Sequence, residues 1–172
     1  MKKLFFIVLI LLFTSSISSA KNIKEAYFAG GCFWCMEDVF EKIKGVKEVI
    51  SGYSGGNTDN PTYKEVTYGN TGHFEAAKII YDGDVINYKE LLNFYWQNID
   101  PFDSAGQFCD KGSSYRSVAF YKTKNEKDEI KNSITNIEKR FKGKKVVTFI
   151  RKFEKFYPAE DYHQDYYKEN FM

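Results

Sequence analysis

Two periodicities of hydrophobic residues divide this chain into strands and helices. His73–Tyr81 alternates with a period of two, which is typical of a strand and places Glu75 on the same face as Ala77 and Ile79. Residues 124–141 instead repeat their apolar positions at helical spacing, with lysine, glutamate and asparagine on the other face. The apolar residues that share this helical face are Ile130, Ile134, Ile137 and Phe141.

The same patterns, separated by turns rich in glycine, aspartate and proline, give the expected order of elements. We expect strand 25–29, helix 32–44, strand 46–50, a short extended segment 63–68, strand 73–81, helix 88–97, strand 115–121, helix 124–141 and strand 145–151. Helices that alternate with short strands favour two layers, with the helices on one face of a sheet. The predicted fold class is therefore α+β: a two-layer, ferredoxin-like β-α-β-β-α-β core with an added helix and strand.

The first twenty residues have the pattern of a secretory signal peptide. Two lysines follow Met1, an apolar run extends over residues 4–13, and small residues lead to Ala20. The apolar run is too short to span a bilayer, so we expect cleavage after Ala20. Residues 21–172 would then form one exported domain, periplasmic or extracellular. The alternative is an uncleaved N-terminal anchor.

Composition narrows the possible partners. The chain of 172 residues has a formal net charge of +2, and removal of the two lysines of the signal peptide would bring it to zero. A near-neutral surface of mixed charges gives no argument for nucleic acid. The aromatic content of 18% is too high for a disordered chain, and the length suits one compact domain, which we expect to be a monomer.

The three cysteines indicate redox chemistry rather than structural disulfides. Three are too few for a disulfide framework, and Cys32 and Cys35 form a C-x-x-C pair. Together with His73 and His163 the cysteines could in principle ligate zinc. Because there is no second spaced pair, we predict no metal.

Cys32 is the candidate nucleophile. It follows Gly30 and Gly31 between a predicted strand and a predicted helix, so it lies at the first turn of that helix. Free backbone N–H groups and the positive end of the helix dipole meet there, and both favour the thiolate, which is the nucleophilic form. The alternative is a buried cysteine that only fills space.

Further residues near this cysteine in sequence, or of suitable chemistry, could complete a site. Glu75, on a mostly apolar strand, would have a raised pKa and could act as a general acid, unless it lies on an edge strand facing water. Tyr63 and Tyr115 could donate hydrogen bonds to a developing oxyanion, although packing is the default for any one tyrosine. Phe33 and Trp34 point apart on the helix, so at least one should wall an apolar cavity beside the sulfur, with ordinary packing as the alternative.

Six ordered blocks resemble the A-type peptide-methionine sulfoxide reductases and cover nearly all of the chain after the signal peptide. The blocks are GCFWCME (31–37), SGYSGG (51–56), NPTYKEV (60–66), TGHFE (71–75), GQFCD with YRS (106–110 and 115–117) and YPAEDYHQ (157–164). Any one block alone would not be specific, but six in the family's order are.

The resemblance implies a reaction for these residues. Cys32 attacks the sulfoxide sulfur, Glu75 gives a proton to the leaving oxygen, and Tyr63 and Tyr115 hold that oxygen by hydrogen bonds. Methionine leaves, and Cys32 remains as a sulfenic acid.

The resemblance also implies how substrate is held. Phe33 and Trp34 would cage the substrate methyl group, and Asp110 would support the polar side of the site. The family acts on the S epimer of methionine sulfoxide, free or in peptides and proteins, and needs neither metal nor organic cofactor.

A second thiol should then condense with the sulfenic acid to form a disulfide, which a thioredoxin-like dithiol donor would reduce. Many family members carry this thiol in a C-terminal tail, but here no cysteine follows Tyr167, so it is Cys35 or Cys109. Cys35 needs the least loop closure, although a disulfide across the first turn would strain the helix. Cys109 lies in a glycine-containing loop that could reach Cys32.

The alternative function is a thioredoxin-type thiol–disulfide oxidoreductase that uses Cys32 and Cys35 on protein disulfides. Two bulky aromatic residues between the cysteines argue against it, as does the lack of a proline that resembles the cis-proline of that fold.

Overall fold

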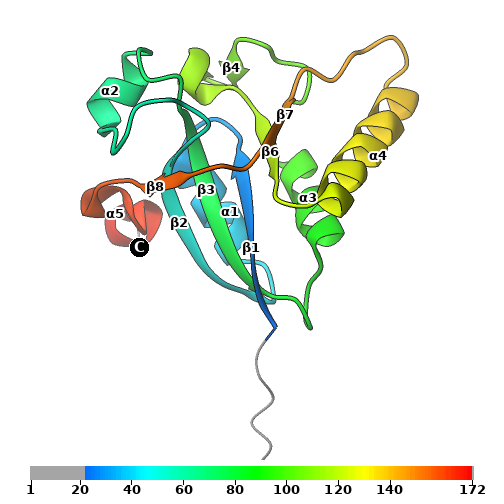
Figure 1. The fold of residues 1–172 in the computed structure, drawn as a ribbon, viewed down its shortest axis with the longest axis horizontal. Helices are drawn as coiled ribbons and strands as arrows, with labels where there is room; N and C mark the ends of the chain where they lie inside the picture. The colour runs from blue at the N-terminus through cyan, green and yellow to red at the C-terminus, as the bar shows by residue number, and fades with distance from the viewer. Residues whose placement is uncertain (1–21, 172) are drawn as a thin grey trace, which may run out of the picture.

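A six-stranded sheet forms the centre of the structure, a computed structural model that describes residues 22–171 (Figure 1). The sheet order is β7-β6-β1-β3-β2-β8, and all neighbours are antiparallel except β6 and β7. Its strands are β1 (Ile23–Ala29), β2 (Val46–Ser54), β3 (Phe74–Asp82), β6 (Val118–Tyr121), β7 (Phe149–Lys152) and β8 (Phe156–Pro158).

The remaining elements are helices, a short hairpin and two 3₁₀ turns. The helices are α1 (Phe33–Glu41), α2 (Tyr63–Thr67), α3 (Tyr88–Gln97), α4 (Lys124–Arg140) and α5 (Tyr166–Phe171). The hairpin consists of β4 (Gly106–Gln107) and β5 (Asp110–Lys111), and the 3₁₀ turns are Ser113–Tyr115 and Asp161–His163. None of the helices between residues 22 and 171 is long and apolar enough to cross a bilayer. The signal peptide predicted at 1–20 lies outside the described residues.

The predicted ferredoxin-like core is confirmed. The elements β1, α1, β2, β3, α3 and β6 follow one another as β-α-β-β-α-β, and their strands lie in the order β6-β1-β3-β2. The added helix and strand are α4 and β7. The last strand, β8, pairs with the free edge of β2 and was not expected.

Alternation along the strands separates two apolar layers. Phe28 of β1 and Ile79 of β3 point toward α1 and α3, where they meet Phe40 and Tyr95. Alternate residues on the opposite face pack with the C-terminal strands and their connection; they include Tyr27, Ala76, Phe120, Phe153 and Phe156. Glu75 shares the first of these faces with Ala77 and Ile79, as the sequence predicted, and the strand directs its carboxyl toward α1.

Some element boundaries differ from the expected ones for local reasons. Residues 63–67 are helical rather than extended, because Thr62 and Glu65 form a capping box that starts α2. The strand expected at 115–121 begins only at Val118, after the 3₁₀ turn. Strand β2 continues to Ser54, because β3 and β8 pair with its second half on both sides.

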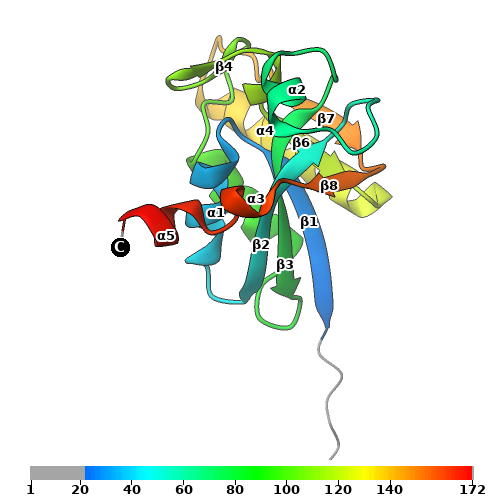
Figure 2. The same cartoon turned by 90° about the vertical axis from the view of Figure 1, so that its left-hand side faces the viewer.

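One end of the sheet gathers the segments that carry the candidate residues. Figures 1 and 2 show α2 and the β4–β5 hairpin together at that end, and Figure 2 shows α5 beside α1. The fold therefore brings segments from the start, middle and end of the chain to one place.

Candidate active site

Cys32 lies at the junction of β1 and α1, as expected. It is the N-cap residue of α1, and its half-buried thiol follows Gly31, whose φ is +89°. A Cβ added to Gly31 would lie only 2.7 Å from the Cβ of Gln107. The glycine therefore lets the β4 hairpin pack directly against the turn that carries the cysteine.

Glu75 faces this helix start from β3. Its side chain is 1% exposed, and Oε2 accepts a hydrogen bond of 3.1 Å from the backbone N–H of Phe33, the first residue of α1. Burial raises the pKa of Glu75 to about 8 despite this hydrogen bond, which lowers it. The carboxyl is thus buried, as predicted, rather than facing water, and its raised pKa favours the protonated form at neutral pH.

Tyr63, Tyr115 and Asp110 converge on the same carboxyl. Tyr63 begins α2 and Tyr115 ends the 3₁₀ turn, and a hydrogen bond joins their hydroxyl groups. Tyr115 lies close enough to Glu75 to lower its pKa, and the charge of Asp110 in β5 raises it. Burial raises the pKa of both tyrosines, so each keeps the proton that it could donate to an oxyanion.

The thiols of Cys32 and Cys35 act on each other, and neither is bridged. A hydrogen bond from Cys32 lowers the pKa of Cys35 to about 6. That hydrogen bond and burial raise the pKa of Cys32, although the Cys35 backbone N–H, which donates to the Cys32 sulfur, lowers it. The interaction between the two thiols thus favours ionisation of the exposed Cys35 over that of Cys32. The sequence predicted the thiolate on Cys32. The Cys35 backbone N–H favours it there, as expected at a helix start, but the hydrogen bond between the two thiols and burial oppose it.

The two aromatic residues after Cys32 have different surroundings. Phe33 is 1% exposed and packs among Tyr53, Tyr63 and His163, so its ring lies beneath the site rather than on its surface. Trp34 is half-buried and stacks on Tyr166, with ring centroids 3.7 Å apart. Of the two predicted cage residues, Trp34 is thus the one that offers a surface, and for Phe33 the packing alternative describes the structure.

Cys109 occupies the tip of the β4–β5 hairpin, and its side chain is exposed. The structure therefore presents two exposed cysteines, of which Cys35 is the one that shares a hydrogen bond with Cys32.

The histidines considered as zinc ligands do not join the cysteines. His73 bonds to the backbone, with Nδ1 3.1 Å from the Gly56 nitrogen and Nε2 2.8 Å from the Thr58 oxygen. His163 is 3% exposed and is surrounded by aromatic rings, and both of its ring nitrogens lack a hydrogen-bond partner among the described residues. Burial lowers the pKa of His163, which keeps the ring neutral.

The C-terminal segment supplies groups that the sequence did not predict. Glu160 accepts hydrogen bonds of 2.9 Å from the Tyr63 backbone N–H and from the Tyr53 hydroxyl. The Tyr167 hydroxyl lies 3.4 Å from the Cys35 sulfur. For Glu160 the signal in the sequence was the block YPAEDYHQ (157–164), which gave it no role, and for Tyr167 it was the aromatic density of the tail, which indicated packing against the body without saying where.

An acidic cluster also lies next to α1. Oxygens of Glu37, Glu41 and Asp165 lie within 4.8 Å of one another. Lys168 bonds to Glu41 at 2.7 Å and to Asp165 at 2.6 Å, so a side-chain cation already pairs with two of the three carboxylates.

Comparisons with known proteins agree with this geometry. The family described as peptide methionine sulfoxide reductase matches residues 24–172. A peptide methionine sulfoxide reductase MsrA of Listeria monocytogenes is 52% identical over 151 residues, which are 87% of this chain and 85% of the relative. MsrA 2 of Staphylococcus aureus is 50% identical over 147 residues, 84% of this chain and 82% of that protein.

The fold is also similar to solved structures. Reduced Mxr1 from Saccharomyces cerevisiae superposes with a TM-score of 0.78 at 33% identity and covers 86% of both chains. Methionine sulfoxide reductase A of Corynebacterium diphtheriae gives a TM-score of 0.77 at 28% identity, over 86% of this chain and 75% of that one.

Proposed function

The chain belongs to the peptide methionine sulfoxide reductase family, and from that premise we propose how its own residues divide the reaction. It is a thiol-dependent oxidoreductase that reduces methionine sulfoxide to methionine. The thioredoxin-type alternative is set aside. The observation that best supports the division of roles is the buried, protonated Glu75 carboxyl, held by the N–H of Phe33 beside Cys32.

In the first half-reaction the Cys32 sulfur attacks the sulfoxide sulfur. Its proton passes along the shared hydrogen bond to the Cys35 thiolate, so that the charge reaches the attacking atom only as the new bond forms. Glu75 gives its proton to the sulfoxide oxygen, and the Tyr63 and Tyr115 hydroxyls donate hydrogen bonds to that oxygen. The protonated oxygen then passes from the methionine sulfur to the Cys32 sulfur while the bond between the two sulfurs breaks. Methionine leaves with its sulfur reduced by two electrons, and Cys32, oxidised by two, is a sulfenic acid.

Asp110 acts on the proton donor, and the aromatic rings contact the substrate. The charge of Asp110 helps to keep Glu75 protonated. Trp34, stacked on Tyr166, offers the apolar surface for the substrate methyl group, and Phe33 supports it from below. We assign the S epimer, free or in a peptide, as substrate, with no metal or organic cofactor.

In the second half-reaction Cys35, now a thiol, attacks the sulfenic sulfur. The Cys32–Cys35 disulfide forms, and the oxygen leaves as water. A thioredoxin-like dithiol then restores both thiols by exchange. The hydrogen bond between the two cysteines favours Cys35 over the exposed Cys109 as the resolving thiol.

Serine variants test these roles. Cys32→Ser should abolish sulfoxide reduction. Cys35→Ser, which also lacks the proton acceptor, should release one methionine per enzyme more slowly than the wild type and then stop, while Cys109→Ser, the matched control, should turn over like the wild type. The measurement is methionine released with and without a dithiol donor, with mass spectrometry of the disulfide formed. Full turnover after replacement of both Cys35 and Cys109 would contradict the disulfide step.

We also propose that the protein is exported and that residues 1–20 are removed. The support is the sequence pattern of a charged start, a short apolar run and small residues before Ala20. Cell fractionation with N-terminal sequencing tests this; a full-length chain retained inside the cell would contradict it.

A further inference from the structure

The C-terminal helix brings a tyrosine to the resolving cysteine. Tyr167 lies in α5, and its hydroxyl is 3.4 Å from the Cys35 sulfur on α1. Its neighbour Tyr166 stacks on Trp34 with an angle of 7° between the ring planes. Two consecutive tyrosines therefore contact two consecutive residues of the C-x-x-C turn.

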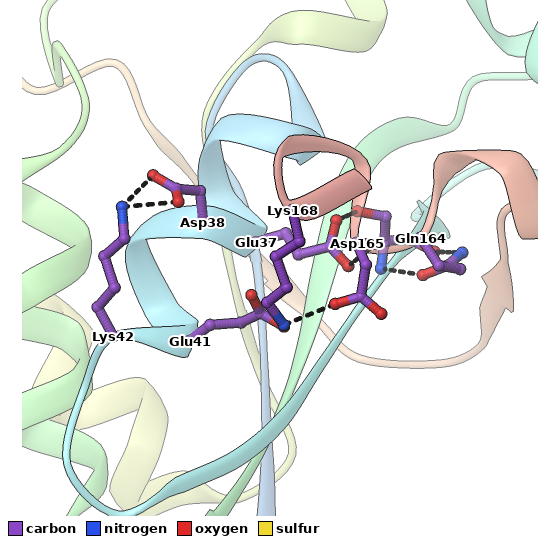
Figure 3. A network of polar contacts seen from close by, with 8 residues as sticks. Glu37, Asp38, Glu41, Lys42, Gln164, Asp165 and Lys168 are labelled. Atoms are coloured by element: carbon purple, nitrogen blue, oxygen red, sulfur yellow. Dashed lines mark hydrogen bonds and ion pairs between the residues drawn. The ribbon is translucent and has the colours of Figure 1, made fainter. Parts of the chain in front are cut away.

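A network of polar contacts fixes this helix against α1 (Figure 3). The Asp165 backbone N–H donates a hydrogen bond of 3.1 Å to Glu37, which is 2% exposed. Gln164 bonds to both the nitrogen and the oxygen of Ser51 in β2, each at 3.0 Å. Asp165 adopts a φ of +52°, which turns the chain into α5 directly after these contacts. The position of Tyr167 is thus set by the fold on both sides of the turn.

The other groups around Cys35 differ in their effect on its charge. Asp38 on the same helix and Asp110 on β5 are acidic, and both raise the pKa of Cys35, as burial does. Among the groups that face its sulfur, the Cys32 thiol and the Tyr167 hydroxyl lower it. Since Cys32 is consumed in the reaction, Tyr167 is the donor that stays the same in the reduced and oxidised enzyme.

We propose that the Tyr167 hydroxyl holds Cys35 as a thiolate in the reduced enzyme and so sets the reduction potential of the Cys32–Cys35 disulfide. A donor that stabilises the thiolate stabilises the reduced form, which makes the disulfide easier to reduce. This inference rests on the proposed resolving role of Cys35. Tyr167 acts through that sulfur and is a positioning residue.

Reduction of the Cys32–Cys35 disulfide is a thiol–disulfide exchange in which atoms, electrons and charge balance. The enzyme disulfide and a reduced dithiol donor give the Cys32 thiol, the Cys35 thiolate, the donor disulfide and one proton. Two electrons pass from the donor sulfurs to the enzyme sulfurs, and the Tyr167 hydroxyl keeps its proton while it donates a hydrogen bond to the thiolate. The hydrogen bond with Cys35, and then burial, raise the pKa of Tyr167 to about 12, so the hydroxyl remains a donor at neutral pH.

Tyr167→Phe removes the hydroxyl and keeps the ring. Its test is the equilibrium of the enzyme with a glutathione redox buffer at pH 8, compared with Tyr162→Phe, which alters an exposed tyrosine of the same segment. For Tyr167→Phe alone we expect the equilibrium to shift roughly tenfold toward the disulfide, so that the reduction potential of the enzyme becomes about 30 mV more negative. An unchanged potential would overturn the inference.

A second measurement separates this inference from the resolving step. In a Cys32→Ser, Cys109→Ser background Cys35 is the only thiol, and the pH dependence of its alkylation by iodoacetamide reports its ionisation. Adding Tyr167→Phe should raise that pKa by about one unit, a tenfold loss of thiolate below it. The result stands even if Cys109 proves to be the resolving thiol, whereas an unchanged alkylation profile overturns the role of Tyr167.

Discussion

At the scale of single residues, the surroundings of Glu75 raise its pKa and make it suitable as a general acid. The strand places it opposite Tyr53 of β2, under the start of α1, where water does not reach it. The Phe33 N–H is one of the free donors of the first helical turn and would favour a carboxylate. Burial outweighs this donor and the Tyr115 hydroxyl, and it favours the protonated carboxyl at neutral pH.

Glu75→Gln should therefore slow the chemical step and leave substrate binding nearly unchanged. The amide keeps the hydrogen bond from Phe33 but has no proton to give, so we expect methionine formation in a single turnover to fall by about 10²–10⁴-fold. In the wild type the same rate should decline above pH 8, as Glu75 ionises. Rapid-quench measurement of methionine across pH 6–10 checks both points. A variant with the wild-type rate would contradict the proton donation.

The residue types of this site could be predicted from the sequence, but the location of its charge could not. The C-x-x-C pair and a glutamate on an apolar strand indicated a thiol and a general acid without any coordinates. Ionisation of Cys35 is favoured by its hydrogen bond with Cys32 and by the Tyr167 hydroxyl, which reaches it from the C-terminal end, whereas burial disfavours ionisation of Cys32. Neither the burial of Cys32 nor the approach of Tyr167 is visible in a local pattern.

At the scale of elements, the turn from β1 into α1 depends on its contact with the β4–β5 hairpin. Gln107 is 1% exposed, and its side chain bonds to the nitrogen and oxygen of Asp100, which fixes the connection between α3 and β4. Gly31 lies against this rigid residue with no room for a side chain. The hairpin therefore holds the position of Cys32 from outside the helix.

Gly31→Ala should disturb this contact more than a comparable glycine replacement elsewhere. Gly143 has a similar φ of +84°, but a Cβ there would meet nothing within 4 Å. Both variants carry the backbone penalty of roughly 1 kcal/mol, and only Gly31→Ala must also displace Gln107. We expect Gly31→Ala to lose more stability in urea unfolding, and to lose kcat/KM as well. Equal losses for the two variants would contradict a role for the hairpin.

The long elements were predictable and the short ones were not. Helices 88–97 and 124–140 carry several turns of apolar periodicity, and the observed bounds lie within a residue of those expected. Strand β8 and helix α5 have three and six residues, too few for a period to show. They form because the sheet edge of β2 and the face of α1 are available to them, which is a property of the folded chain.

At the scale of the whole molecule, two buried ionisable groups change the stability of the fold in opposite directions as pH rises. Glu75 has a raised pKa, so the folded protein binds more protons than the unfolded chain between pH 4.5 and 8, and its contribution to stability falls as pH rises through this range. His163 has a lowered pKa, so the unfolded chain binds more protons below pH 6.5, and its contribution is lost as pH falls.

Glu75→Gln should isolate the first of these effects. Relative to the wild type, the variant's free energy of unfolding should improve by on the order of 3 kcal/mol between pH 5.5 and 8.5, because the variant no longer buries a charge at the higher pH. Urea unfolding at both pH values measures this difference, with Glu154→Gln on the exposed surface as the control. The change that removes activity should thus add stability at alkaline pH, since the acid function requires a carboxyl where an ionised one is costly. A constant difference between variant and wild type across this range would mean that Glu75 ionises as freely in the folded protein as in the unfolded chain.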